Sequence, residues 1–353
     1  MSWRDRLRPV VPDFGKALWH RLLGHAVILA YHRVTTLPPG GDPYRLAVTP
    51  ATFDAQMAVL RKRFRPVSLY EITEALLANR PLPPRAVAVT FDDGYADNLL
   101  EAAPILARHG VPAAFFITSG MIENREEFWW DDLERIVLAS PSLPRRLELE
   151  LGPGPELPEP FRWDAEEACP PAEVLPREGA VFPRTLNSSR RSLFLRLARV
   201  LKGLPREGQT ACLDALAAWA GVGREVRPER RTMSAGEVAT LAATPSFTVG
   251  AHTATHPRLA SLAPEAQRRE IEGSKRDLEG LLGRAVGMIA YPYGDGASIG
   301  GAAPGIAREA GFTLGFAATG GYVRAGVDPF LLPRFFVYEW TEKEFLAELG
   351  RLL

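Results

Sequence analysis

Cysteine, net charge and long apolar runs are scarce in this sequence. Its two cysteines, Cys169 and Cys212, show no CxxC spacing. This argues against a disulfide scaffold, and we expect two structural thiols in a reducing compartment. The 42 basic and 42 acidic side chains give a formal net charge of +0. Electrostatics therefore favour neither nucleic acid nor an anionic membrane as a partner.

The sequence also lacks a stretch that predicts membrane insertion or export. No run of about 18 uncharged apolar residues occurs, which argues against a transmembrane segment. The basic N-terminal stretch is interrupted by His20, Arg21 and His25 and has no small-residue cleavage site. We therefore expect a cytoplasmic protein. Residues 1–24 are predicted to form a surface helix packed on the domain. The alternative is an amphipathic helix that would make the protein membrane-peripheral.

Short apolar runs alternate with helical patterns along the chain. The runs are continuous, as in strands of a parallel sheet that is buried on both faces. They span 26–31, 86–91, 113–117, 246–251, 286–291, 312–318 and 330–338. Amphipathic helices are predicted between them at 50–64, 96–110 and 264–283, the last two ending at glycine. Seven or eight such units predict an α/β barrel. A doubly wound open sheet is the alternative, but no GxGxxG follows any strand.

One segment interrupts this alternation. Residues 140–185 contain ten prolines, which is too many for regular structure. Two amphipathic helices are predicted to follow, the first beginning near Ser188. We therefore expect an insertion over 121–235, between a barrel formed by 25–120 and 236–353. The FWWDD stretch at its start could anchor the insertion to the core or act as a substrate-facing lid.

Two adjacent acids, Asp92 and Asp93, end the apolar run AVAVTF. Two buried carboxylates repel each other and lose hydration, so a compensating interaction is required. A cation bound by one carboxylate would supply it and leave the other free to accept a proton. The alternative is that one aspartate only caps the next helix.

His252 and His256 follow another apolar run with i, i+4 spacing. On one helical turn this spacing puts both imidazoles on the same side, where they could share a metal ion. Two histidines and one carboxylate would leave coordination positions open for water and substrate. Zinc suits these ligands best, although cobalt, nickel, manganese and iron tolerate similar ones.

Three motifs resemble those of the polysaccharide deacetylase superfamily, also called the NodB-homology or carbohydrate esterase family four group. They are TFDDG at 90–94, HTATHP at 252–257 and YPYG at 291–294, and the resemblance covers roughly 25–120 and 235–340. It implies a distorted (β/α) barrel, usually of seven strands, and metal-dependent removal of acyl groups from sugars.

The resemblance also implies a role for each matching residue. Asp92 would be the general base, and the metal ligands would be Asp93, His252 and His256. Thr253 would brace the histidine loop. The YPYG motif, with Pro292 and Tyr293, would place a backbone N–H to hold the oxyanion.

The sequence departs from the family pattern in two places. Many members have an arginine shortly before the PY of the third motif and a late leucine-x-histidine that supplies the general acid. This chain has Met288-Ile289-Ala290 there and no histidine after His256. We expect His32, in a segment similar to the YHxV of permuted members, to be the general acid. Arg334 is expected to replace the arginine and hold Asp92 ionised through a bidentate pair.

The predicted function is therefore metal-dependent removal of N-acetyl groups from a saccharide or glycoconjugate precursor. An amidase acting on a non-carbohydrate C–N bond is the nearest alternative. An alternative of another class is a catalytically silent carbohydrate-binding or scaffold protein, which the missing arginine and histidine would suit. In either case the segment 121–235 could contact glycan-assembly enzymes.

Overall fold

The computed structural model describes residues 24–352 except 79, 124–125, 150–160, 165–188 and 325. The helix expected over 1–24 lies outside these residues apart from Gly24, as does Cys169. Cys212 is buried and forms no disulfide. In the part of the chain described, no helix is both long and apolar enough to cross a membrane.

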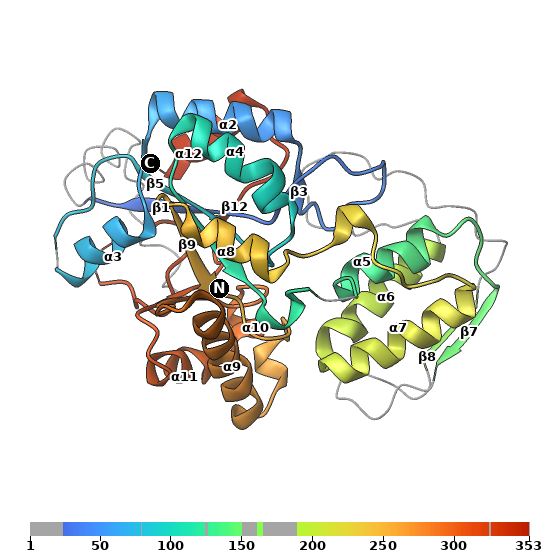
Figure 1. Ribbon diagram of the computed structural model, residues 1–353. Helices are drawn as coiled ribbons and strands as arrows, with labels where there is room; N and C mark the ends of the chain where they lie inside the picture. Colours follow the sequence, from blue (N-terminus) through green and yellow to red (C-terminus); the bar gives the residue numbers. More distant parts are fainter. Residues whose placement is uncertain are drawn as a thin grey trace, which may run out of the picture.

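A curled sheet of parallel strands forms the centre of the molecule (Figure 1). In sheet order its strands are β11 (Leu314–Phe316), β10 (Met288–Ala290), β9 (Phe247–Ala251), β6 (Ala113–Ile117), β5 (Ala86–Phe91), β1 (Ala26–Tyr31) and β12 (Phe335–Phe336). The short β4 (Arg65–Pro66) pairs with β5 beside this path. A bridge between Phe316 of β11 and Leu332, which lies three residues before β12, brings the two edges of the sheet close together. The distorted (β/α) barrel is therefore confirmed.

Both faces of the sheet are buried, as the continuous apolar runs predict. Alternate residues such as Ile28 and Phe116 belong to a cluster inside the barrel. Their neighbours Val27 and Phe115 pack in the larger cluster beneath the helices. Since side chains alternate along a strand, only runs that are apolar at every position can satisfy both layers.

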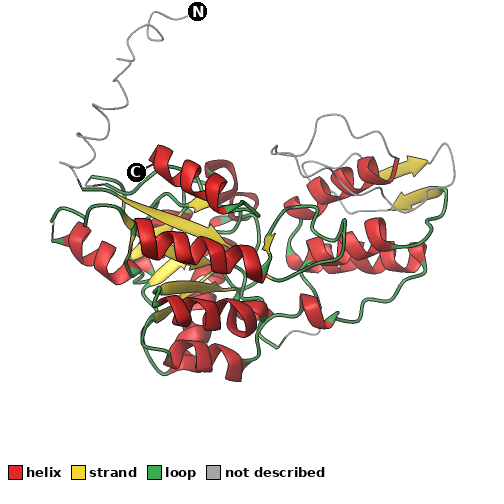
Figure 2. Ribbon diagram, turned by 90° about the horizontal axis from the view of Figure 1, so that it is seen from above, coloured by secondary structure: helices red, strands yellow, loops and turns green. Residues whose placement is uncertain are grey.

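Helices surround this sheet on its outer side (Figures 1 and 2). They are α2 (Pro50–Arg63), α3 (Leu69–Leu77), α4 (Ala103–His109), α8 (Ala235–Ala243), α9 (Pro264–Leu282), α10 (Gly296–Ile299), α11 (Ala303–Glu309) and α12 (Glu342–Leu352). The helix ends predicted at Gly110 and Gly283 are confirmed, since both glycines adopt the left-handed conformation, with φ of 61° and 63°.

Shorter elements join these helices and strands. Two π-helical turns, η2 (Asn98–Ala102) and η4 (Glu134–Ala139), continue into or from α-helices. The 3₁₀ turns are η3 (Ser119–Met121), η5 (Pro228–Arg230) and η6 (Leu259–Ser261). The strands β2 (Arg33–Val34) and β3 (Ala47–Val48) form a small parallel pair of their own.

The described part of residues 128–222 forms a lobe beside the barrel (Figures 1 and 2). It contains α5 (Trp129–Leu133), α6 (Ser189–Gly203), α7 (Arg206–Ala220) and the antiparallel pair β7 (Arg146–Leu149) and β8 (Phe161–Asp164). The lobe has a hydrophobic cluster of its own. The expectation that 140–185 lacks regular structure is wrong, because β7 and β8 use the proline-free stretches at 146–149 and 161–164.

The chain leaves and re-enters the barrel at neighbouring points. The hydroxyl of Thr232 donates to the carbonyl of Met121, and the N–H of Glu123 donates to the carbonyl of Met233 at 3.3 Å. The lobe is thus an insertion whose two ends meet at the barrel. The division of the chain at 120/121 and 235/236 stays a prediction.

Candidate active site

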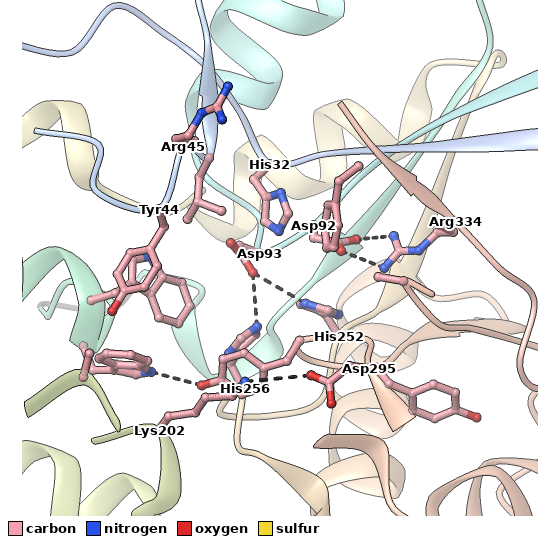
Figure 3. A pocket seen from close by; sticks show the side chains of 18 of the residues that line it. His32, Tyr44, Arg45, Asp92, Asp93, Lys202, His252, His256, Asp295 and Arg334 are labelled. Carbon is pink, nitrogen blue, oxygen red and sulfur yellow. Dashed lines mark hydrogen bonds and ion pairs between the residues drawn. The ribbon is translucent and has the colours of Figure 1, made fainter. Parts of the chain in front are cut away.

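Parallel pairing brings the sequence-predicted residues to one edge of the sheet. The register matches Tyr31 of β1 with Phe91 of β5, and Ile117 of β6 with Ala251 of β9. The residues that directly follow these strands therefore lie at the same end of the barrel. Figure 3 shows His32, Asp92, Asp93, His252 and His256 around one cavity.

Asp93, His252 and His256 form a buried group with metal-ligand chemistry. Asp93 Oδ1 lies 3.5 Å from Nε2 of His252 and 3.4 Å from Nε2 of His256. The three ligand atoms lie within 4.8 Å of one another. Asp93 Oδ1 has no hydrogen-bond partner among the described residues. A buried carboxylate oxygen facing two imidazole nitrogens is the donor set that a divalent transition metal takes.

Several residues of the candidate site have strained backbone conformations. Four non-glycine residues there adopt the left-handed conformation: Asp93 (φ 72°), Thr253 (62°), His256 (60°) and Tyr293 (63°). Such residues cost free energy and concentrate at functional sites. They also overturn one expectation. His252 and His256 do not lie on a helical turn, because the chain after β9 forms a loop that turns through Thr253 and His256.

Hydrogen bonds hold this histidine loop in place. The hydroxyl of Thr253 donates to the carbonyl of His252 at 2.6 Å and accepts from the N–H of His256 at 3.1 Å. One carboxylate oxygen of Glu270, on α9, accepts from the N–H groups of Ala254 and Thr255. Thr253 thus lies where a brace of the loop is expected. Glu270 stabilises the same loop, but no motif in the sequence indicates this residue.

The two imidazoles are fixed in different ways. His252 Nδ1 lies 2.8 Å from the carbonyl oxygen of Ala290, which turns Nε2 toward Asp93. His256 Nδ1 is buried without a hydrogen-bond partner among the described residues. Burial lowers the pKa of His256 to about 3, against the opposing charge of Asp93. The neutral form that results is the one that binds metals.

Asp92 is paired with Arg334, as the sequence predicts. The two guanidinium nitrogens Nη1 and Nη2 donate to Oδ1 and Oδ2 at 2.6 and 2.7 Å (Figure 3). Arg334 also donates to Thr90 Oγ1 and to the carbonyl of Ala317, each at 3.2 Å. Burial alone would raise the pKa of Asp92, but Arg334 holds it well below its usual range. Asp92 is therefore an ionised carboxylate at neutral pH.

A cavity of about 490 Å³ opens over these groups. His32 lines it, with its ring stacked on Phe336 at a centroid distance of 5.4 Å. The lobe supplies part of the wall through Trp129, Trp130 and residues of α6, including Lys202. Sequence reasoning missed these α6 residues, because nothing in their pattern distinguishes them from the polar face of a surface helix.

The FWWDD stretch packs against His256 and Tyr293 in the candidate site. Trp130 is 6 % exposed, and its ring meets the His256 ring edge-on at 4.9 Å. Nε1 of Trp129 donates to the hydroxyl of Tyr293 at 3.2 Å. Both tryptophans are thus buried anchors that also line the cavity, and the lid role stays a prediction.

The YPYG motif has a steric explanation. Gly294 adopts φ 72°, and a Cβ at this position would lie 2.6 Å from the backbone nitrogen of Ala318. Only glycine allows this approach. The turn places Tyr293 beside His256, with ring centroids 4.9 Å apart. Pro292 precedes it in the same loop.

This curled parallel barrel, with an aspartate and two histidines buried at its strand ends, is the arrangement expected for hydrolases of the NodB-homology class. Comparison with known proteins agrees. The family model described as "Polysaccharide deacetylase" matches residues 79–140 and 212–315. Over these two stretches the chain is similar to the polysaccharide deacetylase family.

Individual relatives are more distant. The poly-beta-1,6-N-acetyl-D-glucosamine N-deacetylase of Escherichia coli is 34% identical over 90 residues, which are 25% of this chain and 13% of that protein. The deacetylase PplD of Streptococcus pyogenes, solved with acetate, has a TM-score of 0.58 at 17% identity, over 93% of this chain and 99% of that one. IcaB from Ammonifex degensii gives 0.56 at 19%, over 93% and 97%. At these identities the two structures show a shared fold alone.

Proposed function

We propose that this protein is a metal-dependent hydrolase that removes N-acetyl groups from a saccharide or glycoconjugate precursor. One observation carries the proposal: Asp93, His252 and His256 bring three ligand atoms together in a buried site at the rim of a cavity. Similarity to the polysaccharide deacetylase family supports deacetylation as the reaction. The named substrate of the Escherichia coli relative supports a saccharide, although the match spans only 13% of that protein.

The residues fit a divalent metal ion. Asp93 Oδ1 is buried without a hydrogen-bond partner in the described chain, and it faces Nε2 of both histidines. Two imidazoles and one carboxylate favour zinc, and cobalt, nickel, manganese or iron are the alternatives. When bound, such an ion lowers the pKa of a coordinated water and polarises the acyl carbonyl.

Asp92 is proposed as the general base. Its carboxylate lines the cavity next to Asp93 and is kept ionised by Arg334. It can therefore accept a proton from the water that attacks the amide carbonyl. Arg334 donates one hydrogen bond to each carboxylate oxygen of Asp92, which fixes the plane of the carboxylate relative to the cavity.

His32 is proposed as the general acid. In Figure 3 its ring reaches toward the aspartates from the strand end beside β5. Burial has the largest effect on the pKa of both Asp92 and Asp93 and raises it, while the nearby His32 is among the groups that lower it. As the C–N bond breaks, His32 would donate a proton to the departing nitrogen, giving acetate and a free amine. The backbone N–H of Tyr293, in its left-handed turn after Pro292, would hold the carbonyl oxygen.

The cytoplasmic location and a contact with glycan-assembly enzymes through 121–235 belong to the same proposal. A nucleotide- or lipid-linked sugar would be the substrate of an enzyme in that compartment. Cell fractionation followed by detection of the protein tests the location directly.

The central test compares the metal content of the purified wild type with Asp93→Ala/His256→Ala, together with acetate release from a panel of N-acetylated saccharides. The matched control is Asp54→Ala/His109→Ala, which removes an Asp–His pair 2.7 Å apart that does not line the cavity. We expect stoichiometric metal and acetate release in the wild type and control, and neither in the site variant. A wild type that takes up no metal and releases no acetate would overturn the proposal and favour a silent binding protein.

A further inference from the structure

The His256 imidazole is surrounded by aromatic rings and lacks a hydrogen bond at Nδ1 among the described residues. Its Nδ1 has no partner among the described residues, unlike Nδ1 of His252. Three rings surround it edge-on: Trp130 and Tyr293 at 4.9 Å, and Phe128 at 5.9 Å, with interplanar angles of 66°, 71° and 72°. We call these three rings the His256 cage. Two of them belong to the lobe, so the lobe completes the surroundings of a barrel residue.

The cage is itself fixed by hydrogen bonds. Nε1 of Trp130 donates to the hydroxyl of Tyr95 at 2.8 Å, and that hydroxyl donates to Asp131 Oδ2 at 2.5 Å. Phe128 stacks on Trp130, with centroids 4.4 Å apart and planes inclined by 6°. The orientation of the Trp130 indole is therefore set by the Tyr95 hydroxyl.

Tyr95 and Asp131 are in turn held by buried charges. Nη1 of Arg230 donates to Asp131 Oδ1 at 2.7 Å, and both side chains are buried. The guanidinium of Arg33 lies 4.3 Å above the centre of the Tyr95 ring. Breaking one of these contacts would leave a buried charged or polar group without its partner, so the network resists rearrangement.

We propose that Tyr95 is a positioning residue that fixes His256 through Trp130, so that the lobe tunes the affinity of the metal site. The inference rests on the proposed function, because it concerns a histidine that the proposal makes a metal ligand. Nδ1 of the imidazole has no hydrogen-bond partner among the described residues that would hold the ring if the cage were loosened. The orientation of Nε2 toward Asp93 then depends on how well Trp130 is held.

The test measures the Zn²⁺ dissociation constant of the whole protein by competition with a coloured chelator, which needs no substrate. Tyr95→Phe keeps the ring and removes the hydroxyl, and we expect it to weaken binding by about 10-fold or more. Trp130→Phe removes the indole N–H without altering the loop next to Asp93, and we expect a similar loss. Both variants break the same hydrogen bond between Trp130 and Tyr95. The double variant should therefore bind Zn²⁺ about as well as either single variant.

Tyr31→Phe is the matched control. Tyr31 is equally buried, and its hydroxyl donates to Gln56 on α2 at 2.9 Å, away from the cavity. It should lower the unfolding temperature of the metal-free protein about as much as Tyr95→Phe and leave the dissociation constant unchanged.

Two results would overturn the inference. If the wild type binds zinc and Tyr95→Phe or Trp130→Phe binds it equally well, the positioning role is wrong while the proposed function stands. A wild type with no affinity for zinc or the other candidate ions would instead overturn the proposed metal site, and the positioning role with it.

Discussion

Arg334 and Asp92 form a bidentate ion pair between two strand ends that are not neighbours in the sheet. Asp92 follows β5 and Arg334 precedes β12, and β1 lies between those strands. The pair therefore spans the rim of the barrel beneath the cavity. Both partners are almost fully buried, so neither charge can regain its hydration if the other is removed.

Replacing this arginine by lysine tests the pair. Arg334→Lys keeps one positive charge but cannot form the bidentate pair with the two carboxylate oxygens of Asp92. The pKa of Asp92 should rise toward its ordinary value, since Arg334 is what lowers it. Because Asp92 must be ionised to accept a proton, the acidic limb of the pH–rate profile should move to higher pH. We also expect kcat/KM to fall by about 10²-fold through misplacement of the carboxylate.

An acidic limb at the same pH in Arg334→Lys, with metal content unchanged, would contradict this role. Arg334→Met is the harsher variant. It should lower the free energy of unfolding by about 3–5 kcal/mol, because it leaves a buried carboxylate unpaired. Chemical denaturation measures this loss.

The proposed acid is tested by removing its imidazole. His32→Ala should lower kcat by about 10²–10⁴-fold while the protein retains its metal, because protonation of the leaving nitrogen is then left to water. His109→Ala is the control, since that histidine pairs with Asp54 and does not line the cavity. Turnover by His32→Ala close to that of the wild type would remove His32 from the mechanism.

The lobe side of the cavity is tested through Lys202. Its Nζ lies 4.2 Å above the Tyr293 ring and 3.8 Å from Asp295, so α6 contacts the loop of the third motif. Lys202→Met should raise KM by about 5-fold, the ratio that ~1 kcal/mol of lost contact gives, with kcat less affected. Arg196→Met, on the same helix but outside the cavity lining, is the control. A change in kcat alone would argue against a wall that acts in binding.

Stability at acidic pH should depend on Glu237, which caps α8 and pairs with Arg231 through two contacts of 2.7 Å. These hydrogen bonds lower its pKa from 4.5 to about 2. Its contribution to folding is therefore present above pH 4.5 and is lost as the pH falls toward about 2. Glu237→Gln should cost about 1 kcal/mol at neutral pH, and the difference from the wild type should shrink below pH 4.5.

Urea unfolding at neutral pH and in steps below it measures this difference. Glu71→Gln is the control, because Glu71 forms the same capping box on α3 and no ion pair to it is described. An equal, pH-independent cost in both variants would show that Arg231 contributes nothing.

The barrel was predictable because each strand must satisfy two apolar layers, which leaves a continuous run in the sequence. The four residues Asp92, Asp93, His252 and His256 were predictable for a related reason. Charged or titratable groups that directly follow a buried strand must gather at one edge of a parallel sheet. Arg334 was matched to Asp92 as a replacement for the arginine that the family resemblance implies.

Other features depend on contacts that sequence patterns do not encode. The histidine loop was expected to be helical, but Glu270 and the hydroxyl of Thr253 satisfy its backbone in a left-handed turn. The β7–β8 pair escaped notice because the prolines around it dominate the composition. Tyr95 and Lys202 reach the site only through tertiary packing of the lobe on the barrel rim.

The meeting of residues 121–123 with 232–233 also bears on how such a protein can change over time. A segment whose two ends already touch can gain or lose residues without moving either anchor. The entropic cost of closing a longer loop grows only with the logarithm of its length. Changes of length or sequence in the outer part of the lobe should therefore have little effect on the stability of the barrel. The few lobe residues that face His256 cannot be replaced in the same way. New substrate preferences could arise on this insertion while the strand ends beneath it stay as they are.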